Sequence, residues 1–502
     1  MFIANFKLLI KVVMKALSVS FFKIKKRLAG ASTALLVVLF FTGMKTANCK
    51  APVILPAAQD TSVSASIKTL LANGGGYYYP ASLNRFYLQN GYNLAWIKPE
   101  TAKAHSWEAM LLLDCVIQFG LNHADYHPQE LVYDKLHFLT EHFDTASATE
   151  KAVYDIMLTD AMLAFMNNLH YGKLNPNFAA GKVDEGVNGN MVADSVLTAA
   201  LIDKDFMSAV INVQPKSAAY VSLQYHMHLL AGLYTGDCYD TPEGDLRKMA
   251  VNMERLRWIS NDDLYYIGIN IPSYTLTVHK PDTAYLFKVI VGKPATATPT
   301  LESAIIYFTT APEWKVPQKI FAKETLPKAL KNIDYLENNH FAIYSNSGKY
   351  LEPTHGNILA ALRNPTGYYA RQSSGCDNSL GAIVFRFPNV YDVYLHDTPE
   401  QKLFAQTDRA FSHGCIRVEN AGKLAGLLLQ EDGSANKAPE VYRAMKNYQT
   451  KTFTLKKAAP IKVTYLTSEV VDGYVVMYND IYNLDKRLEM ALYGVEQPLT
   501  MQ

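Results

Sequence analysis

The sequence predicts an α+β protein in which a helical N-terminal domain precedes a β-rich domain. Apolar residues recur at helical spacing from about residue 67 to 235. After Trp258 they occur instead in short runs rich in β-branched and aromatic residues, with turns between the runs. The 502 residues exceed one ordinary domain, and 49% hydrophobic against 19% charged residues suffice for sizeable cores. We therefore expect two folded domains behind an N-terminal segment of different character.

The N-terminal segment is typical of an exported protein. Its first 27 residues carry seven Lys and Arg and no acidic residue, and an apolar stretch from Leu28 to Met44 follows. A basic flank before an apolar run keeps the positive end inside and sends the rest of the chain outward. A run of about 17 residues is at the short end for spanning a bilayer. Residues 1–52 are therefore expected to be a signal peptide or a signal anchor, and lipidation at Cys49 stays open.

Three features define the helical domain, which we expect over residues 67–245. Residues 53–66 before it are mostly small and predict a linker. Within it, Trp107–Ile117 and Ala152–Leu169 place apolar side chains at i, i+3, i+4 and i+7, and the second run ends at Tyr171-Gly172. After it, residues 235–245 form an acidic loop marked by Gly and Pro, which predicts the domain boundary.

The β-rich domain is expected over residues 246–455. Its short runs predict strands at Tyr265–Pro272, Tyr274–Val278, Tyr285–Val291, Ala382–Phe387 and Val390–His396. A helix is expected over Ala421–Gln430, with Asn420 as its N-cap. Residues 456–502 should add a strand at Ile461–Leu466 and a helix at Ile481–Leu492, both packed on this domain.

Charge and cysteine content exclude several kinds of function. The 48 Lys and Arg residues nearly balance 46 Asp and Glu residues, so we expect no nucleic-acid partner. The five cysteines are widely spaced, with no CxxC pair, which argues against a disulfide framework and against a zinc site. A Cys115–Cys238 or a Cys238–Cys376 bridge stays open. One remaining thiol could then be chemically active.

The segment Ser412-His413-Gly414-Cys415-Ile416-Arg417 carries the strongest chemical signal. A thiol is mostly protonated at neutral pH, so a nucleophilic cysteine needs a base or a cation beside it. In an extended chain, residues two apart point to the same side, which would bring His413 to Cys415. Gly414 leaves room for the backbone to bend, and amides at this point could stabilise an oxyanion. Arg417 could hold a substrate carboxylate or brace the loop.

This string, with His396 some twenty residues upstream, resembles the active-site signature of the L,D-transpeptidase family, whose catalytic domain is of the YkuD type. The likeness extends to the large periplasmic YcbB-type branch and covers roughly residues 80–490. Segments that carry it include FYLQNGYNLAW (86–96), LTDAMLAFMNNLHYGKLNP (158–176), NMERLRWI (252–259), VGKPATATPTL (291–301) and RAFSHGCIRVEN (409–420). The resemblance implies a scaffold domain, then a catalytic domain with a capping insertion at about 313–375.

The resemblance also implies a reaction. Cys415 would attack the carbonyl of the third residue of a peptidoglycan stem and expel the terminal D-Ala. The amine of a second stem would open the thioester and give a 3→3 cross-link. His413 would take the thiol proton, and His396 would line the site. Substrate or oxyanion binding would fall to Ser412, Gly414 and Arg417.

Donor and acceptor stems would be the partners of such an enzyme. Carbapenem-type β-lactams would be its inhibitors, and neither a metal nor another cofactor is implied. The resemblance further predicts a periplasmic location, with an inner-membrane anchor through residues 28–44 left open. Three more residues could support the site or have structural roles: Asn378, Arg409 and Tyr369.

Alternative functions stay open at this point. Water could open the same thioester, which would make the protein an L,D-carboxypeptidase, or a protein amine could do so, which would attach that protein to the wall. A cysteine peptidase or amidase is disfavoured because the histidine precedes the cysteine by two residues. A non-catalytic cell-wall scaffold would predict loss of Cys415 or His413, and both are present.

Overall fold

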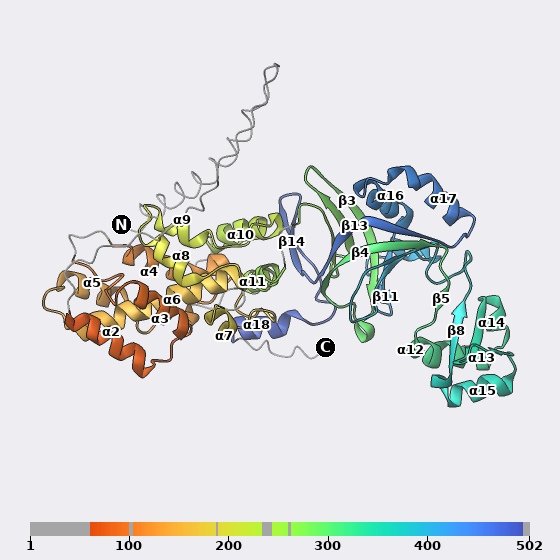
Figure 1. Ribbon diagram of the computed structural model, residues 1–502, viewed down its shortest axis with the longest axis horizontal. Helices are drawn as coiled ribbons and strands as arrows, with labels where there is room; N and C mark the ends of the chain where they lie inside the picture. Colours follow the sequence, from red (N-terminus) through yellow and green to blue (C-terminus); the bar gives the residue numbers. More distant parts are fainter. Residues whose placement is uncertain (1–60, 100–103, 187–188, 233–242, 260–262, 495–502) are drawn as a thin grey trace, which may run out of the picture. The chain divides into compact units, whose positions relative to one another are not determined.

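The computed structural model describes residues 61–99, 104–186, 189–232, 243–259 and 263–494 (Figure 1). The expected signal segment, Cys49, Cys238 and most of the expected boundary loop lie outside these ranges. Within them, none of the helices combines the length and the apolar character needed to cross a membrane. The described part confirms the α+β class, with helices first and a β-rich domain after them.

The helical domain is built around α6 (Ala148–Tyr171), which is buried over almost its whole length. Because side chains on all of its faces are buried, α6 has to be enclosed by other elements. Its start is specified by a capping box between Ser147 and Glu150, and its end by Gly172, whose φ of +89° disfavours other residues. Its neighbours are α2 (Thr61–Asn73), α3 (Pro80–Gln89), α4 (Ser106–Asp114), α5 (Tyr133–Glu141), α8 (Ala193–Ala200), α9 (Phe206–Ile211) and α11 (Gly244–Arg257). Two more helices of the domain pack farther out, α7 (Ala180–Asp184) on α3 and α10 (Ala218–Ala231) on α11.

One buried carboxylate on α6 organises the chain that follows α3. Asp155 is inaccessible to solvent and accepts hydrogen bonds from the backbone N–H groups of Ala95, Trp96 and Ile97 at 2.8–3.1 Å. It also accepts a bond from the Tyr87 hydroxyl at 2.7 Å. These bonds satisfy donors that would otherwise be buried without partners, so they fix this segment against the core.

The β-rich domain is a sheet whose strand pairings form a closed ring. From β3 the ring runs through β12, β10, β9, β4, β13, β1 and β2, and β2 pairs with β3 again; β11 adds to β3. The bounds are β1 Tyr266–Asn270, β2 Thr275–Lys280, β3 Thr283–Gly292, β4 Leu301–Thr310, β9 Ile383–Arg386, β10 Leu395–His396, β11 Ala410–Ser412, β12 Ile416–Val418 and β13 Lys451–Thr464. Two helices, α16 (Ala421–Glu431) and α17 (Ala438–Lys446), pack on it.

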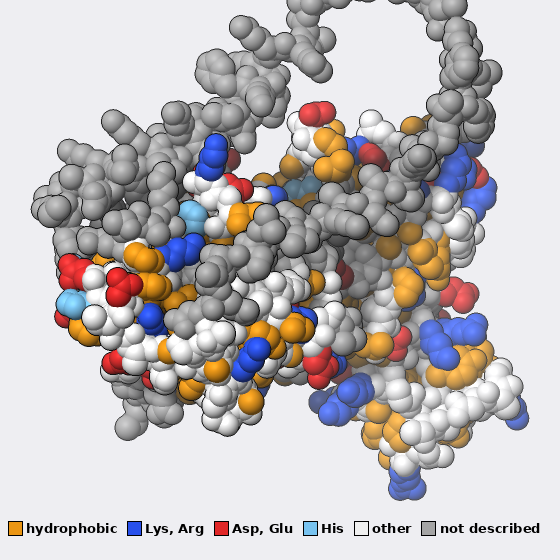
Figure 2. Space-filling model, turned by 60° about the vertical axis from the view of Figure 1, so that its left-hand side comes forward, with side chains coloured by type: hydrophobic (Ala, Val, Ile, Leu, Met, Phe, Trp, Pro, Cys, Tyr) orange, Lys and Arg blue, Asp and Glu red, His pale blue; other side chains and the backbone are white. Residues whose placement is uncertain are grey.

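A separate lobe occupies the expected position of the capping insertion. It has a four-stranded sheet in the order β5 (Trp314–Lys315), β8 (Tyr368–Gln372), β6 (Phe341–Ser345) and β7 (Tyr350–Leu351). Its helices are α12 (Gln318–Ile320), a π-helical turn (Phe321–Thr325), α13 (Leu326–Lys331), α14 (Asp334–Asn338) and α15 (His355–Arg363). Lys and Arg side chains are prominent on the lobe at the lower right of Figure 2.

Several expectations about element boundaries are wrong. Residues 61–66 belong to α2 rather than to a linker, and α11 packs with α10 and α6 rather than in the β-rich domain. Residues 390–394 form a turn and a coil before β10, and only Leu395–His396 pair as a strand. Asn420 stands at the N-cap of α16, but its side chain makes no capping hydrogen bond because its backbone is left-handed.

The C-terminal segment also differs from expectation. A hairpin of β14 (Ser468–Val471) and β15 (Tyr474–Met477) leads to α18 (Asp485–Tyr493). Leu492 and Tyr493 join the core that α10 and α11 form, and an ion pair links Arg255 on α11 to Asp485 at 2.5 Å. The last helix therefore packs on the helical domain, and not on the β-rich domain as the sequence suggested.

Candidate active site

Cys415 lies in a tight turn between two strands that pair with the same neighbour. β11 runs parallel to β3 and β12 runs antiparallel to it, so the chain must reverse at residues 413–415. Gly414 adopts a φ of +119°, which other residues rarely tolerate. The Ser412 hydroxyl donates to the carbonyl of Cys415 at 2.5 Å and accepts from the N–H of Gly414 at 3.1 Å. The extended geometry expected for His413 and Cys415 is therefore wrong.

Residues 292–298 hold this turn from behind. The Thr298 hydroxyl donates to the carbonyl of Gly414 at 2.8 Å and accepts from the N–H of Gly292 at 2.8 Å. The N–H of Lys293 and the hydroxyl of Thr296 both donate to the carbonyl of Ser412, at 3.0 and 3.1 Å. Fixed on both sides, the turn presents the thiol in one orientation, as pre-organised catalysis requires.

The thiol of Cys415 has a largely enclosed environment. Its sulfur lies 3.9 Å from the carbonyl oxygen of Asp392. Burial raises the pKa of the thiol, while the N–H and hydroxyl of Tyr394 and the charge of Arg386 act in the opposite direction. The guanidinium of Arg386 lies 4.1 Å from the centre of the Tyr394 ring. The resting thiol is thus protonated at neutral pH, and a base has to remove its proton before attack.

His413 bonds to the capping lobe. Its Nε2 lies 2.5 Å from Oε1 of Glu324, which belongs to the π-helical turn. A carboxylate can only accept, so Nε2 carries the proton and Nδ1 is the nitrogen left to act as a base. Both side chains are about one third exposed, at 33% and 37%. Glu324 therefore selects the tautomer of His413 in the way that a triad carboxylate does.

His396 is buried, and its neighbours determine its protonation state and its tautomer. Burial, together with the positive charges of Arg417 and Arg386, lowers its pKa to about 3. Its Nδ1 lies 2.6 Å from the carbonyl oxygen of Asp397, so Nδ1 must donate and Nε2 keeps a lone pair. At neutral pH this imidazole is uncharged and can accept a hydrogen bond, but it has no proton to release as a cationic acid.

Arg417 stands opposite His396 because β10 and β12 are parallel neighbours. Its guanidinium forms an ion pair with Glu400 in the loop after β10. Its Nε is buried and has no hydrogen-bond partner among the described residues. The ion pair with Glu400 braces this loop, which is one of the two roles expected for Arg417.

Comparison with known proteins matches two segments of the chain to domain families. Residues 264–443 match the model of the L,D-transpeptidase catalytic domain (YkuD), and residues 81–227 match the Scaffold domain. A Haemophilus influenzae protein named "Putative L,D-transpeptidase" is 32% identical over 246 residues. The match covers 49% of each chain, so this chain spans about half the length of that curated relative.

The order of these two domains in the chain is consistent with the YcbB-like branch that the sequence resembles. Within the catalytic domain, Asn378 and Arg409 have structural contacts. The amide of Asn378 is fully buried and donates to the carbonyls of Pro312 and Ser373, which fastens the base of the capping lobe. Arg409 donates to the carbonyls of Tyr274, Val289 and Gln406, ahead of the catalytic turn.

Tyr369, the third candidate for support, lies on the capping sheet of this domain. Its ring stacks on Tyr344 at 5.6 Å, below the ammonium group of Lys315 at 5.0 Å. The structure thus places Tyr369 on an aromatic and basic face of the lobe. Its role toward substrate stays a prediction.

Sequence reasoning missed three neighbours of the catalytic turn: Glu324, Arg386 and Tyr394. Tyr394 stands two residues before His396, which was a usable local signal. Arg386 reaches the site because β9 pairs with β10, and Glu324 reaches it because the capping lobe folds back toward the turn. No local pattern in the sequence predicts either contact.

The remaining cysteines are separate from this site. Cys376 is exposed and forms no disulfide with another described residue. Cys238 lies outside the described ranges, so its pairing with Cys115 or with Cys376 stays a prediction.

Proposed function

We propose that this protein is a peptidoglycan L,D-transpeptidase that forms 3→3 cross-links through a thioester on Cys415. The observation that carries the proposal is the catalytic turn of a YkuD domain. It holds one cysteine rigidly, and a histidine two residues away has its tautomer selected by Glu324. Stem peptides of peptidoglycan are the proposed donor and acceptor.

The proposed reaction has two balanced steps. The sulfur of Cys415 attacks the carbonyl carbon of the third stem residue, and the bond to the terminal D-Ala nitrogen breaks. Nδ1 of His413 takes the thiol proton and gives it to the departing amine. The side-chain amine of a second stem then attacks the thioester carbonyl, and the C–S bond breaks as the new amide forms. His413 takes a proton from the amine and returns it to the sulfur, which restores the thiol.

The oxyanion of each tetrahedral intermediate needs hydrogen-bond donors. The N–H of Gly414 already bonds to Ser412, so Gly414 does not fill the oxyanion role expected for it. We assign that role to the N–H of Cys415, with the Tyr394 hydroxyl beside the sulfur as a second donor. His396, uncharged and carrying a lone pair on Nε2, would accept a hydrogen bond from the substrate peptide.

Charge supports a substrate rich in carboxylates. Residues 313–375, the capping lobe, contain eight Lys and Arg against five Asp and Glu residues. Such an excess attracts anionic ligands and orients their approach. Because peptidoglycan lies outside the inner membrane, we also propose that residues 1–52 direct export to the periplasm, as their basic and apolar pattern suggests.

The test uses the purified full chain with a disaccharide-tetrapeptide and mass spectrometry of the products. The proposal expects a dimer that has lost one D-Ala, absent with Cys415→Ala. Cys376→Ala removes an exposed thiol outside the catalytic turn, so it is the matched control and should retain the dimer.

Three other results would change or check the proposed reaction. A tripeptide without dimer would replace transpeptidation by L,D-carboxypeptidase activity. A dimer that persists in Cys415→Ala would refute the thioester. Incubation with a carbapenem should add one drug mass to the wild-type protein and none to Cys415→Ala.

A further inference from the structure

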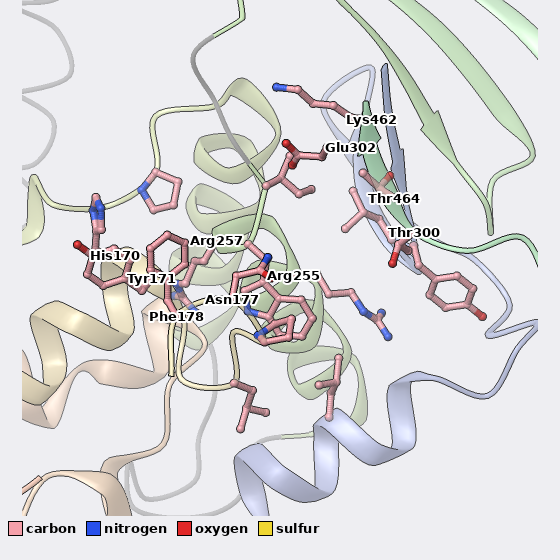
Figure 3. Close-up of a pocket in the computed structure, with 18 of the residues that line it drawn as sticks. His170, Tyr171, Asn177, Phe178, Arg255, Arg257, Thr300, Glu302, Lys462 and Thr464 are labelled. Atoms are coloured by element: carbon pink, nitrogen blue, oxygen red, sulfur yellow. The ribbon is translucent and has the colours of Figure 1, made fainter. Parts of the chain in front are cut away.

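A large cavity lies outside the catalytic turn, between the helical domain, the catalytic sheet and α18. Its volume is about 1870 Å³. Small-molecule pockets commonly measure about 300–1,000 Å³, so this space suits an extended ligand better than a compact one. Figure 3 shows Tyr171, Asn177 and Phe178 on its helical side and Thr300, Glu302 and Lys462 on its strand side.

The walls of this cavity combine aromatic rings with neutral polar groups. Tyr171 and Phe178 form a stacked pair with ring centres 5.0 Å apart. Trp258 and Tyr391 add two further rings, and Tyr391 is 57% exposed. The carboxamides in the lining are those of Asn177, Asn190, Asn212 and Gln214. Flat apolar faces beside amide donors and acceptors suit a ligand that has both apolar faces and many hydroxyl or acetamido groups.

The cations of the cavity are mostly neutralised within the protein. Five Lys and Arg side chains line it, and three of them pair with carboxylates. The pairs are Arg255 with Asp485 at 2.5 Å, Arg257 with Glu254 at 3.3 Å and Lys462 with Asp263 at 3.1 Å. Glu302 adds a negative charge to the same lining. A polyanion would need unpaired cations, so this balance favours an uncharged polar ligand.

Two chain segments connect the cavity to the catalytic turn. Tyr391 lines the cavity, and the carbonyl of the next residue, Asp392, is 3.9 Å from the sulfur of Cys415. On the strand side, Thr300 lines the cavity two residues after Thr298, which bonds to Gly414. A ligand in the cavity therefore lies against the same two loops that position the thiol.

We propose that this cavity binds a strand of N-acetylated amino sugars, the polysaccharide that carries the stem peptides. This inference rests on the proposed function, because it assigns the glycan of the same polymer whose peptides Cys415 would join. Aromatic rings would cover the apolar faces of the sugars, and the carboxamides would bond to acetamido and hydroxyl groups. Peptides projecting from a strand held there would start close to the loop of Asp392.

The experiment measures binding of peptide-free glycan strands, prepared by amidase digestion of peptidoglycan, to the full chain. Trp258 lines the cavity, so its fluorescence should change on binding, and Trp258→Phe should remove that change. In a pull-down of the same strands, Phe178→Ala should bind about tenfold more weakly, since it loses one ring face. Asn177→Ala removes an exposed carboxamide from the same lining, so it tests the cavity even if Phe178→Ala does not fold.

Matched controls separate the cavity from the rest of the surface and from catalysis. Tyr474 is a 77% exposed aromatic residue outside the lining, and Tyr474→Ala should bind strands as the wild type does. Cys415→Ala should also bind them normally. Equal binding by Phe178→Ala, Asn177→Ala and the wild type would overturn the proposal, as would absence of binding by a protein that cross-links disaccharide-tetrapeptides. Binding by a protein that lacks this turnover would refute the proposed reaction and leave the glycan site standing.

Discussion

Replacement of Glu324 by glutamine tests whether the capping lobe takes part in catalysis. The amide oxygen of the new side chain could still accept a hydrogen bond from Nε2 of His413, but the negative charge that stabilises a protonated imidazole would be gone. The Nε2–Oε1 distance of 2.5 Å marks a strong contact, whereas exposures of 33% and 37% leave it open to solvent screening. We therefore assign the charge about 1 kcal/mol in the transition state.

That energy corresponds to a fall in kcat of about fivefold, with little change in KM. The assay is the rate of dimer formation from disaccharide-tetrapeptide under saturating substrate. Glu337→Gln is the matched control, since it removes an exposed carboxylate from the same lobe without touching His413. A Glu324→Gln rate within twofold of the wild type, or an equal loss in Glu337→Gln, would refute the positioning role of Glu324.

Three further predictions concern buried ionisable groups. Burial raises the pKa of Glu469 from 4.5 to about 7. The native state therefore binds a proton more tightly than the unfolded state, and its stability falls as pH rises between these values. In urea unfolding, the free energy of unfolding of Glu469→Gln should exceed that of the wild type by about 1–2 kcal/mol at pH 8 but not at pH 4. Folding lowers the pKa of His396 from 6.5 to about 3, so its ring NMR signals should not titrate between pH 5 and 8. Stability should decrease as pH falls below 6.5, and at pH 4 the wild type should have lost about 2–3 kcal/mol more than His396→Gln. Asp155→Asn should lower the free energy of unfolding in urea by about 3 kcal/mol, because its amide N–H₂ would face backbone N–H groups that now donate to the carboxylate. Asp144 is exposed, so Asp144→Asn should change stability little.

Much of the fold follows from local patterns in the sequence. The apolar spacing of Ala152–Leu169 and its Gly172 stop define a helix that the structure extends only to Ala148–Tyr171. The strands at Tyr266–Asn270 and Ile383–Arg386 lie inside their expected runs. Local patterns failed where packing between distant segments determines the position of an element. The amphipathic face of α18, for example, does not indicate that the helix packs on α11 rather than on the sheet.

The catalytic turn illustrates the same division. The string from Ser412 to Arg417 predicted the candidate site, because a histidine two residues from a cysteine suggests an activated thiol and the complete string resembles a family signature. Only the tertiary structure decided how they act. Opposite strand directions beside β3 turn His413 toward Glu324 of the capping lobe, and burial next to Arg417 leaves His396 uncharged. Both depend on contacts between residues far apart in the chain, and such contacts leave no local pattern.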